Sequence, residues 1–222
     1  MLRACLGKVW LAVGLLAVAL GIGSLRADWD FNRIGSRAEQ LYGPLGDGRG
    51  RLDDWQRLLR EQVGVEEVAQ LQAVNRFFNL RLRFRDDIQT WNVKDYWATP
   101  VEALFRGAAD CEDYAIAKYF SLRQLGVPSE KLRITYVKAL RLNQAHMVLT
   151  YYAHPEAMPL VLDNLIDAIE PASQRSDLLP VYAFNAEGLW LPGARGGKQV
   201  GDSKRLSRWQ DLLGKMRAEG FP

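Results

Sequence analysis

The hydrophobic periodicity of the chain changes at Pro128, and this change narrows the folds open to it. Before Pro128, apolar residues recur at three- and four-residue spacing, which is typical of amphipathic helices. After it, residues 132–137 alternate and are rich in β-branched and aromatic side chains, which is typical of a strand. Helices are predicted at 36–42, 52–61, 65–81 and from Cys111 to before Gly126, and strands at 132–137, 145–152, 159–163 and, as a hairpin turning at 185–188, within 177–191. Helices followed by strands predict an α+β domain, with N-terminal helices packed on an antiparallel β-sheet.

Signals for helix ends are clear in the middle of the chain. Thr99 and Glu102 occupy the N-cap and N3 positions around a proline at N1, and Gly107 ends the short helix that they begin. Two alanines then lead to Asp110, an expected N-cap. Cys111 therefore falls in the first turn of the next helix.

Two further segments have simple interpretations. The glycine-rich segment 43–50 is predicted to be a loop, and it lacks the Lys-Ser/Thr ending of a phosphate-binding P-loop. Ser207 is predicted to cap a C-terminal helix.

Residues 1–27 have the pattern of a secretory signal peptide. A short basic region precedes the apolar run 9–22, and Ala27 is the expected last residue before cleavage. The two residues before Ala27 are larger than a signal peptidase prefers, so an uncleaved membrane anchor is the alternative. In both cases residues 28–222 form one domain that faces outward from the cytoplasm.

The charge of the chain does not indicate a nucleic-acid partner. The formal net charge of +3 comes from the leader, which holds three basic residues and no acid. The remainder has 26 basic and 26 acidic residues and is neutral, so no basic surface is predicted.

Cys111 is unusual in its surroundings. With Cys5 in the leader, it is the single cysteine of the mature chain and has no intramolecular disulfide partner. A helix N-terminus favours a thiolate, but Asp110, Glu112 and Asp113 oppose it. At roughly 6 Å and an effective dielectric of about 20, one carboxylate raises a thiol pKa by about two units. Cys111 is therefore either a buried, inert side chain or a nucleophile whose acidic neighbours are neutralised.

His146 and Asp163 are candidate partners for this thiol. His146 lies in one predicted strand and Asp163 ends the next, whereas His154 precedes a proline in a turn and is read as a solvated loop residue. An imidazole that accepts the proton of Cys111, with a carboxylate on its other nitrogen, is what thiol-based acyl transfer requires. Taken singly, His146 is equally a hydrogen-bonded sheet residue and Asp163 a turn former.

Two motifs resemble the bacterial transglutaminase-like cysteine proteases of the periplasmic LapG type. They are DYWATP at 95–100 and GAADCEDY at 107–114, and the likeness extends over about residues 65–168. The resemblance implies a papain-like, transglutaminase-like core with the nucleophile at a helix N-terminus. It places the family's catalytic triad on Cys111, His146 and Asp163.

The resemblance also implies calcium. The family binds Ca²⁺ through the acids that flank the cysteine, which correspond to Asp110 and Glu112. Ca²⁺ prefers six to eight oxygen ligands, so a further acid is expected, and Asp87 or Asp86 is the candidate. If no cation binds, the alternative interpretation of Asp110 and Asp113 is that they cap the helix.

The expected substrate and partner come from the same resemblance. Family members cleave the N-terminal region of a large surface adhesin at a paired-alanine site, which releases biofilm cells. An inner-membrane receptor that responds to cyclic di-GMP inhibits them. A periplasmic location is therefore expected.

Two other functions remain open, as do two smaller assignments. The same fold also supports protein crosslinking by acyl transfer to an amine, and a secreted binding module with an inert thiol is a non-enzymatic alternative. Trp97 is read either as a groove residue that donates its indole N–H or as core packing. The main-chain N–H of Cys111 is the expected oxyanion donor.

Overall fold

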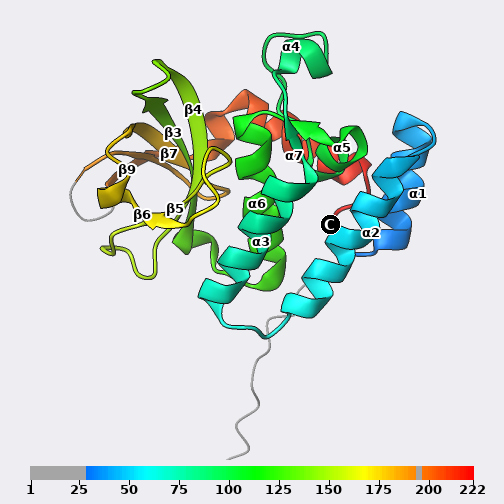
Figure 1. Cartoon of the computed structure of the whole chain (residues 1–222), viewed down its shortest axis with the longest axis horizontal. Coiled ribbons are helices and arrows are strands. Elements are labelled where there is room, and N and C mark those ends of the chain that lie inside the picture. Colours follow the sequence, from blue (N-terminus) through cyan, green and yellow to red (C-terminus); the bar gives the residue numbers. More distant parts are fainter. Residues whose placement is uncertain (1–28, 194–196) are drawn as a thin grey trace, which may run out of the picture.

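The computed structural model describes residues 29–193 and 197–222, and it combines a group of helices with one large β-sheet (Figure 1). In Figure 1, α6 and α3 lie between the sheet and the pair α1 and α2. The helices are α1 (Phe31–Tyr42), α2 (Asp47–Gln62), α3 (Glu67–Arg81), α4 (Asp87–Thr90), α5 (Pro100–Arg106), α6 (Cys111–Leu125) and α7 (Ser207–Ala218). The strands are β1 (Arg83–Phe84), β2 (Ala108–Ala109), β3 (Leu132–Ala139), β4 (Gln144–Tyr151), β5 (Leu160–Leu162), β6 (Glu170–Pro171), β7 (Leu178–Phe184), β8 (Leu189–Leu191) and β9 (Lys198–Gly201). The predicted α+β class is confirmed.

The main sheet brings distant residues of the sequence to one end of the molecule. Its strand order is β6-β5-β4-β3-β7-β8-β9, and each neighbouring pair is antiparallel. In the central hairpin His146 pairs with Val137, and on the next strand Leu162 pairs with Leu149. Because β4 and β5 run in opposite directions, the start of β4 lies beside the end of β5. His146 and Asp163 therefore reach the same end of the sheet.

The central helix of the fold is α6. It packs against β3 and β4 on one side and against α2, α3 and α5 on the others. The core between them holds Ile116, Leu122, Ile134 and Leu149, all fully buried. Because α6 is covered on most sides, it has no polar face that is left to solvent. Even a charged residue on this helix, Lys118, is therefore fully buried. Cys111 is thus the first residue of a helix fixed by tertiary packing.

The chain that enters α6 is held by a capping box and a short strand pair. Thr99 Oγ1 accepts from the Glu102 N–H at 3.0 Å, and Glu102 Oε2 accepts from the Thr99 N–H at 2.8 Å. Gly107 ends α5 with a left-handed φ of 63°. Both features confirm the sequence prediction. The parallel pair β1 and β2, which was not predicted, joins Arg83 to Ala108; two residues are too few to show an alternating pattern.

Several predicted boundaries were wrong. Segment 43–50 is not all loop, because α2 begins at Asp47. Gly48 lies inside that helix where α2 meets α5, and a Cβ there would lie 2.9 Å from Phe105 Cα, so this glycine permits close packing. Ser207 is the first residue of α7, and Leu206 takes the N-cap position without a side-chain cap. The first helix starts earlier than predicted, at Phe31, with Asp30 as its cap.

The predicted leader, residues 1–27, lies outside the described residues, so its cleavage stays a prediction. Within the part of the chain that is described, none of the helices combines the length and the apolar character needed to cross a bilayer.

Candidate active site

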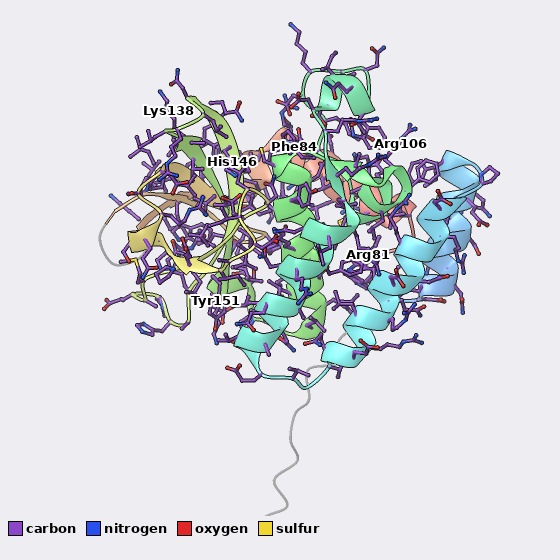
Figure 2. All side chains as sticks on the ribbon, viewed as in Figure 1. Arg81, Phe84, Arg106, Lys138, His146 and Tyr151 are labelled. Carbon is purple, nitrogen blue, oxygen red and sulfur yellow. The ribbon has the colours of Figure 1, made fainter. Side chains whose placement is uncertain are left out.

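Cys111 lies at the start of α6 and lines a groove of about 750 Å³ between the helices and the sheet. His146 and Phe84 line the same groove, and Figure 2 places both at the end of the molecule where the sheet meets the helices. The thiol is partly exposed and donates a hydrogen bond to Glu112 Oε2 at 3.1 Å. Burial and the charges of Glu112 and Asp110 raise the pKa of Cys111, while a hydrogen bond from the Met147 main chain acts in the opposite direction. In this arrangement the thiol is protonated.

His146 and Asp163 form a buried pair at the same end of the sheet. The distance from His146 Nε2 to Asp163 Oδ1 is 2.8 Å, and both side chains are almost fully buried. Burial opposes ionisation of Asp163, but hydrogen bonds from His146, the Leu165 N–H and Arg175 outweigh it and lower its pKa to about 2. An ionised carboxylate only accepts hydrogen bonds, so Nε2 carries a proton. In neutral His146, Nδ1 is then the nitrogen free to accept a proton.

Three acids converge beside Cys111. Asp87, Asp110 and Glu112 each offer a carboxylate oxygen, and these oxygens lie within 4.8 Å of one another. Asp87 is buried on α4, and Glu112 is the second residue of α6. Of the two predicted candidates for a further acid, the structure brings Asp87 into this cluster; Asp86 is exposed and lines the groove.

The electrostatics of this acid cluster fit a cation. Burial, followed by the charges of neighbouring carboxylates, raises the pKa of Asp110 to about 11. Burial also raises the pKa of Asp87 to about 6, helped by Glu112 and Asp95. Oδ1 of Asp87 and Oδ1 of Asp110 are buried and lack hydrogen-bond partners among the described residues. Buried carboxylate oxygens without donors are costly unless a positive charge faces them, and hard oxygen ligands suit Ca²⁺.

The capping interpretation of these acids is not supported for Asp110. This residue occupies the N-cap position of α6, but its side chain makes no capping hydrogen bond. Asp113 fixes the segment 91–99, which joins α4 to α5, since its Oδ1 accepts from the Ala98 N–H at 2.6 Å. Asp87 Oδ2 accepts from the Tyr96 N–H of the same segment at 2.5 Å. The acid cluster and one wall of the groove are therefore mechanically connected.

Trp97 packs in the core and also forms part of the groove wall. It is almost buried and stacks on Phe184, with ring centroids 5.5 Å apart and planes inclined by 14°. It also lines the groove beside Cys111. The exposed position of His154 in its turn agrees with its interpretation as a loop residue.

Sequence reasoning missed Arg175. Its Nη2 donates to Asp163 Oδ2 at 2.7 Å, and its side chain is only 4% exposed. Arg175 follows the short 3-10 turn Ala172–Gln174, where the sequence has no periodic pattern or motif, so no local signal marked it.

The chain is similar in sequence and in fold to known proteins. A family model described as bacterial transglutaminase-like cysteine proteinase matches residues 54–178. The structure of Legionella pneumophila LapG shares 46% identity with a TM-score of 0.73, covering 85% of this chain and 98% of that chain. Its EGTA-treated form shares 46% identity with a TM-score of 0.74, covering 85% of this chain and 98% of that chain. Its calcium-bound form shares 45% identity with a TM-score of 0.71, covering 84% of this chain and 98% of that chain. No match was found among curated proteins.

These likenesses confirm the predicted transglutaminase-like fold. The family match covers more than half of the chain, including Cys111, His146 and Asp163, and the LapG likeness covers 85% of the chain. The chain belongs to the bacterial transglutaminase-like cysteine proteinases.

Proposed function

We propose that this chain is a calcium-dependent cysteine endopeptidase of the periplasm, with Cys111, His146 and Asp163 as its catalytic triad. The observation that carries the proposal is that the side chains needed for thiol chemistry lie together at one groove. A buried His146–Asp163 pair and a partly exposed thiol at a helix N-terminus both face it. A thiol in such a groove is accessible, which disfavours the inert binding module.

The mechanism follows from the positions of the proton donors and acceptors. His146 Nδ1 accepts the thiol proton, and Sγ of Cys111 attacks the carbonyl carbon of the scissile peptide. The Cys111 N–H stabilises the oxyanion. The C–N bond then breaks, the leaving amine takes the proton from His146, and an acyl-enzyme remains. His146 next accepts a proton from water as the water attacks the thioester, which releases the acid and restores the thiol. Asp163 holds the Nε2–H tautomer throughout.

Asp87, Asp110 and Glu112 are the residues that would hold Ca²⁺. A bound cation supplies positive charge beside the thiol, where three acids otherwise oppose the thiolate. Glu112 accepts the thiol hydrogen bond. A cation bound to Glu112 would weaken the hydrogen bond that this carboxylate accepts from the thiol, and the thiol proton would then be available to His146. The existence of calcium-bound and EGTA-treated structures of LapG supports calcium as the cation.

Replacing the nucleophile tests the assignment. We expect Cys111→Ala to abolish peptide cleavage and to leave the circular dichroism spectrum and Tm almost unchanged, because a small, partly exposed side chain is lost. Cys5→Ala, which removes the leader cysteine, is the matched control and should retain full activity. Proteolysis by the Cys111→Ala variant would refute the assignment. A labelled primary amine included in the reaction reports crosslinking activity, since a protease yields hydrolysed product and little adduct.

The substrate that we propose is the N-terminal region of a large cell-surface adhesin, cut at a paired-alanine site. The resemblance to LapG supports this, and a groove of about 750 Å³ with Trp97, Met147 and Leu165 in its walls suits an extended peptide with small side chains. The test uses a purified N-terminal adhesin segment and sequencing of the new N-terminus. A cut that persists when both alanines are replaced by aspartate would contradict the proposed site.

The regulator that we propose is an inner-membrane receptor controlled by cyclic di-GMP. The resemblance supports this partner. The predicted leader would place the enzyme in the periplasm, where it could meet the receptor's periplasmic domain. The expected result is inhibition of adhesin cleavage by the receptor's periplasmic domain at stoichiometric concentration. Mass spectrometry of the protein from the periplasmic fraction should find an N-terminus at Asp28; a cytoplasmic, full-length chain would refute the location.

A further inference from the structure

The side chain of Asp163 has two hydrogen-bond donors besides His146. Its Oδ1 faces His146 and also accepts from the Leu165 N–H at 3.0 Å, whereas Oδ2 accepts from Arg175 Nη2 at 2.7 Å. Donors on both oxygens fix the plane of the carboxylate. A carboxylate bound on one oxygen alone can rotate, and rotation would move the acceptor away from His146. Arg175 is not among the residues that line the groove, so it has no contact with a bound substrate there.

Arg175 is itself held in place. Its Nε donates to Asp177 Oδ1 at 3.0 Å and its Nη2 to Asp177 Oδ2 at 2.9 Å, a two-bond contact between guanidinium and carboxylate. The surrounding backbone is also tied down, because the Leu178 N–H donates to the Arg175 carbonyl at 3.0 Å and the Leu140 N–H to the Asp177 carbonyl at 2.8 Å. The guanidinium therefore lies in a fixed position between two acids.

Other charges also face the His146–Asp163 pair. From α6, Lys118 is fully buried, and its Nζ has no hydrogen-bond partner among the described residues. Burial lowers the pKa of Lys118 to about 7, although the charges of Asp163 and Asp167 act against this. On the groove side lie Cys111 and Glu112, as described above. In the described part of the chain, Arg175 is the permanently charged group that hydrogen-bonds Asp163 directly.

We propose that Arg175 is a positioning residue of the catalytic site, which acts on His146 through Asp163. It fixes the rotamer of Asp163 and offsets part of its negative charge. His146 is thereby kept in the Nε2–H tautomer with a free Nδ1, and it is not locked in the protonated state that an uncompensated buried carboxylate would impose. This inference rests on the proposed function, in which His146 accepts the proton of Cys111.

The test reads His146 directly by NMR. The chain has two histidines, so ¹⁵N ring spectra of the full chain are simple, and the exposed His154 is an internal reference. Spectra are recorded in the Cys111→Ala background, which removes the thiol. We expect Arg175→Met to raise the apparent pKa of His146 by about one unit, to weaken the Nε2–H tautomer signature and to leave His154 unchanged. Arg175→Lys, which retains a positive charge, should restore the pKa but not the full tautomer signature.

Kinetics of the active enzyme provide the second readout. With Cys111 present, Arg175→Met should lower kcat by about 10- to 100-fold, a fraction of the roughly 10²–10⁴ that general acid–base catalysis contributes. KM should change little, because Arg175 does not line the groove. Arg123→Met is the matched control: this arginine donates to the Val127 carbonyl at 2.6 Å at the opposite end of α6 from Cys111. It should change neither His146 nor kcat.

The outcomes separate the two proposals. If Arg175→Met lowers Tm but leaves the pKa and tautomer of His146 at their native values, Arg175 is a structural residue and the inference is overturned. If Arg175→Met does not fold, Asp177→Asn loosens the same guanidinium from a partly exposed position and should give the same changes in His146, smaller in size; unchanged His146 signals in that variant would also overturn it. The NMR result is independent of proteolysis, so an inactive native chain would refute the proposed function while the Arg175–Asp163–His146 link is still measured.

Discussion

Neutralising Glu112 tests the electrostatic account of the thiol most directly. Glu112 Oε2 accepts a hydrogen bond from Cys111 Sγ at 3.1 Å, so its charge stabilises the thiol and opposes the thiolate. We consider Glu112→Gln, made in a Cys5→Ala background so that Cys111 is the single cysteine of the chain. The amide keeps the size of the side chain and removes the charge. In EGTA, we expect this variant to have a lower thiol pKa than the native chain.

The size of the effect follows from the distance. At roughly 3–4 Å and an effective dielectric of about 20, one carboxylate disfavours a thiolate by about 4–5.5 kcal/mol, or about three to four pKa units. Glu112 is partly exposed, and solvent screening reduces this to about one to two units. The thiolate fraction then rises about 10- to 100-fold, while the intrinsic nucleophilicity of the sulfur falls with its pKa. The net acceleration of alkylation is about 3- to 10-fold.

The assay is the rate of alkylation by iodoacetamide as a function of pH. In EGTA, Glu112→Gln should react faster than the native thiol, and added Ca²⁺ should accelerate the native chain more than the variant, which has lost a ligand. Asp86→Asn is the matched control, because Asp86 lines the same groove but lies outside the acid cluster. Equal alkylation rates for the native chain and Glu112→Gln in EGTA would show that this carboxylate does not control the thiol.

Two further predictions concern stability. In EGTA, Tm should rise as the pH falls from 8 to 5. The raised pKa values of Asp110 and Asp87, about 11 and about 6, exceed the roughly 3.9 of an unfolded aspartate, so the folded chain binds more protons and loses stability with rising pH; a flat profile by thermal denaturation in EGTA would contradict this. Thr99→Ala removes the α5 cap and the bond that Thr99 Oγ1 donates to buried Glu219, which should cost about 1–3 kcal/mol, or about 2–10 °C in Tm. Ser207→Ala, at a helix start without a side-chain cap, should leave Tm unchanged, and equal losses in the two variants would refute the capping argument.

Local sequence patterns predicted those structural features that are set by residues close together in the chain. The capping box of α5 and the left-handed Gly107 followed from spacing alone, because their hydrogen bonds span three or four residues. The strands β3 and β4 followed from their alternation, and the β7–β8 hairpin followed from its turn residues. The loop prediction for segment 43–50 was wrong because glycine is typical of loops, whereas Gly48 lies inside α2 and permits a close contact with Phe105. No local rule anticipates such a tertiary contact.

The sequence by itself determined the order of helices and strands, the position of Cys111 at a helix start and the identity of His146 and Asp163 as its candidate partners. Only the tertiary structure decided that Asp87, and not Asp86, joins Asp110 and Glu112, and that Arg175 binds Asp163. The physical reason is that such contacts depend on strand register and on the packing of α4 and α6. A shift of strand register by one residue would turn every side chain of the strand to the other face of the sheet. The spacing of residues along the chain therefore does not specify these contacts.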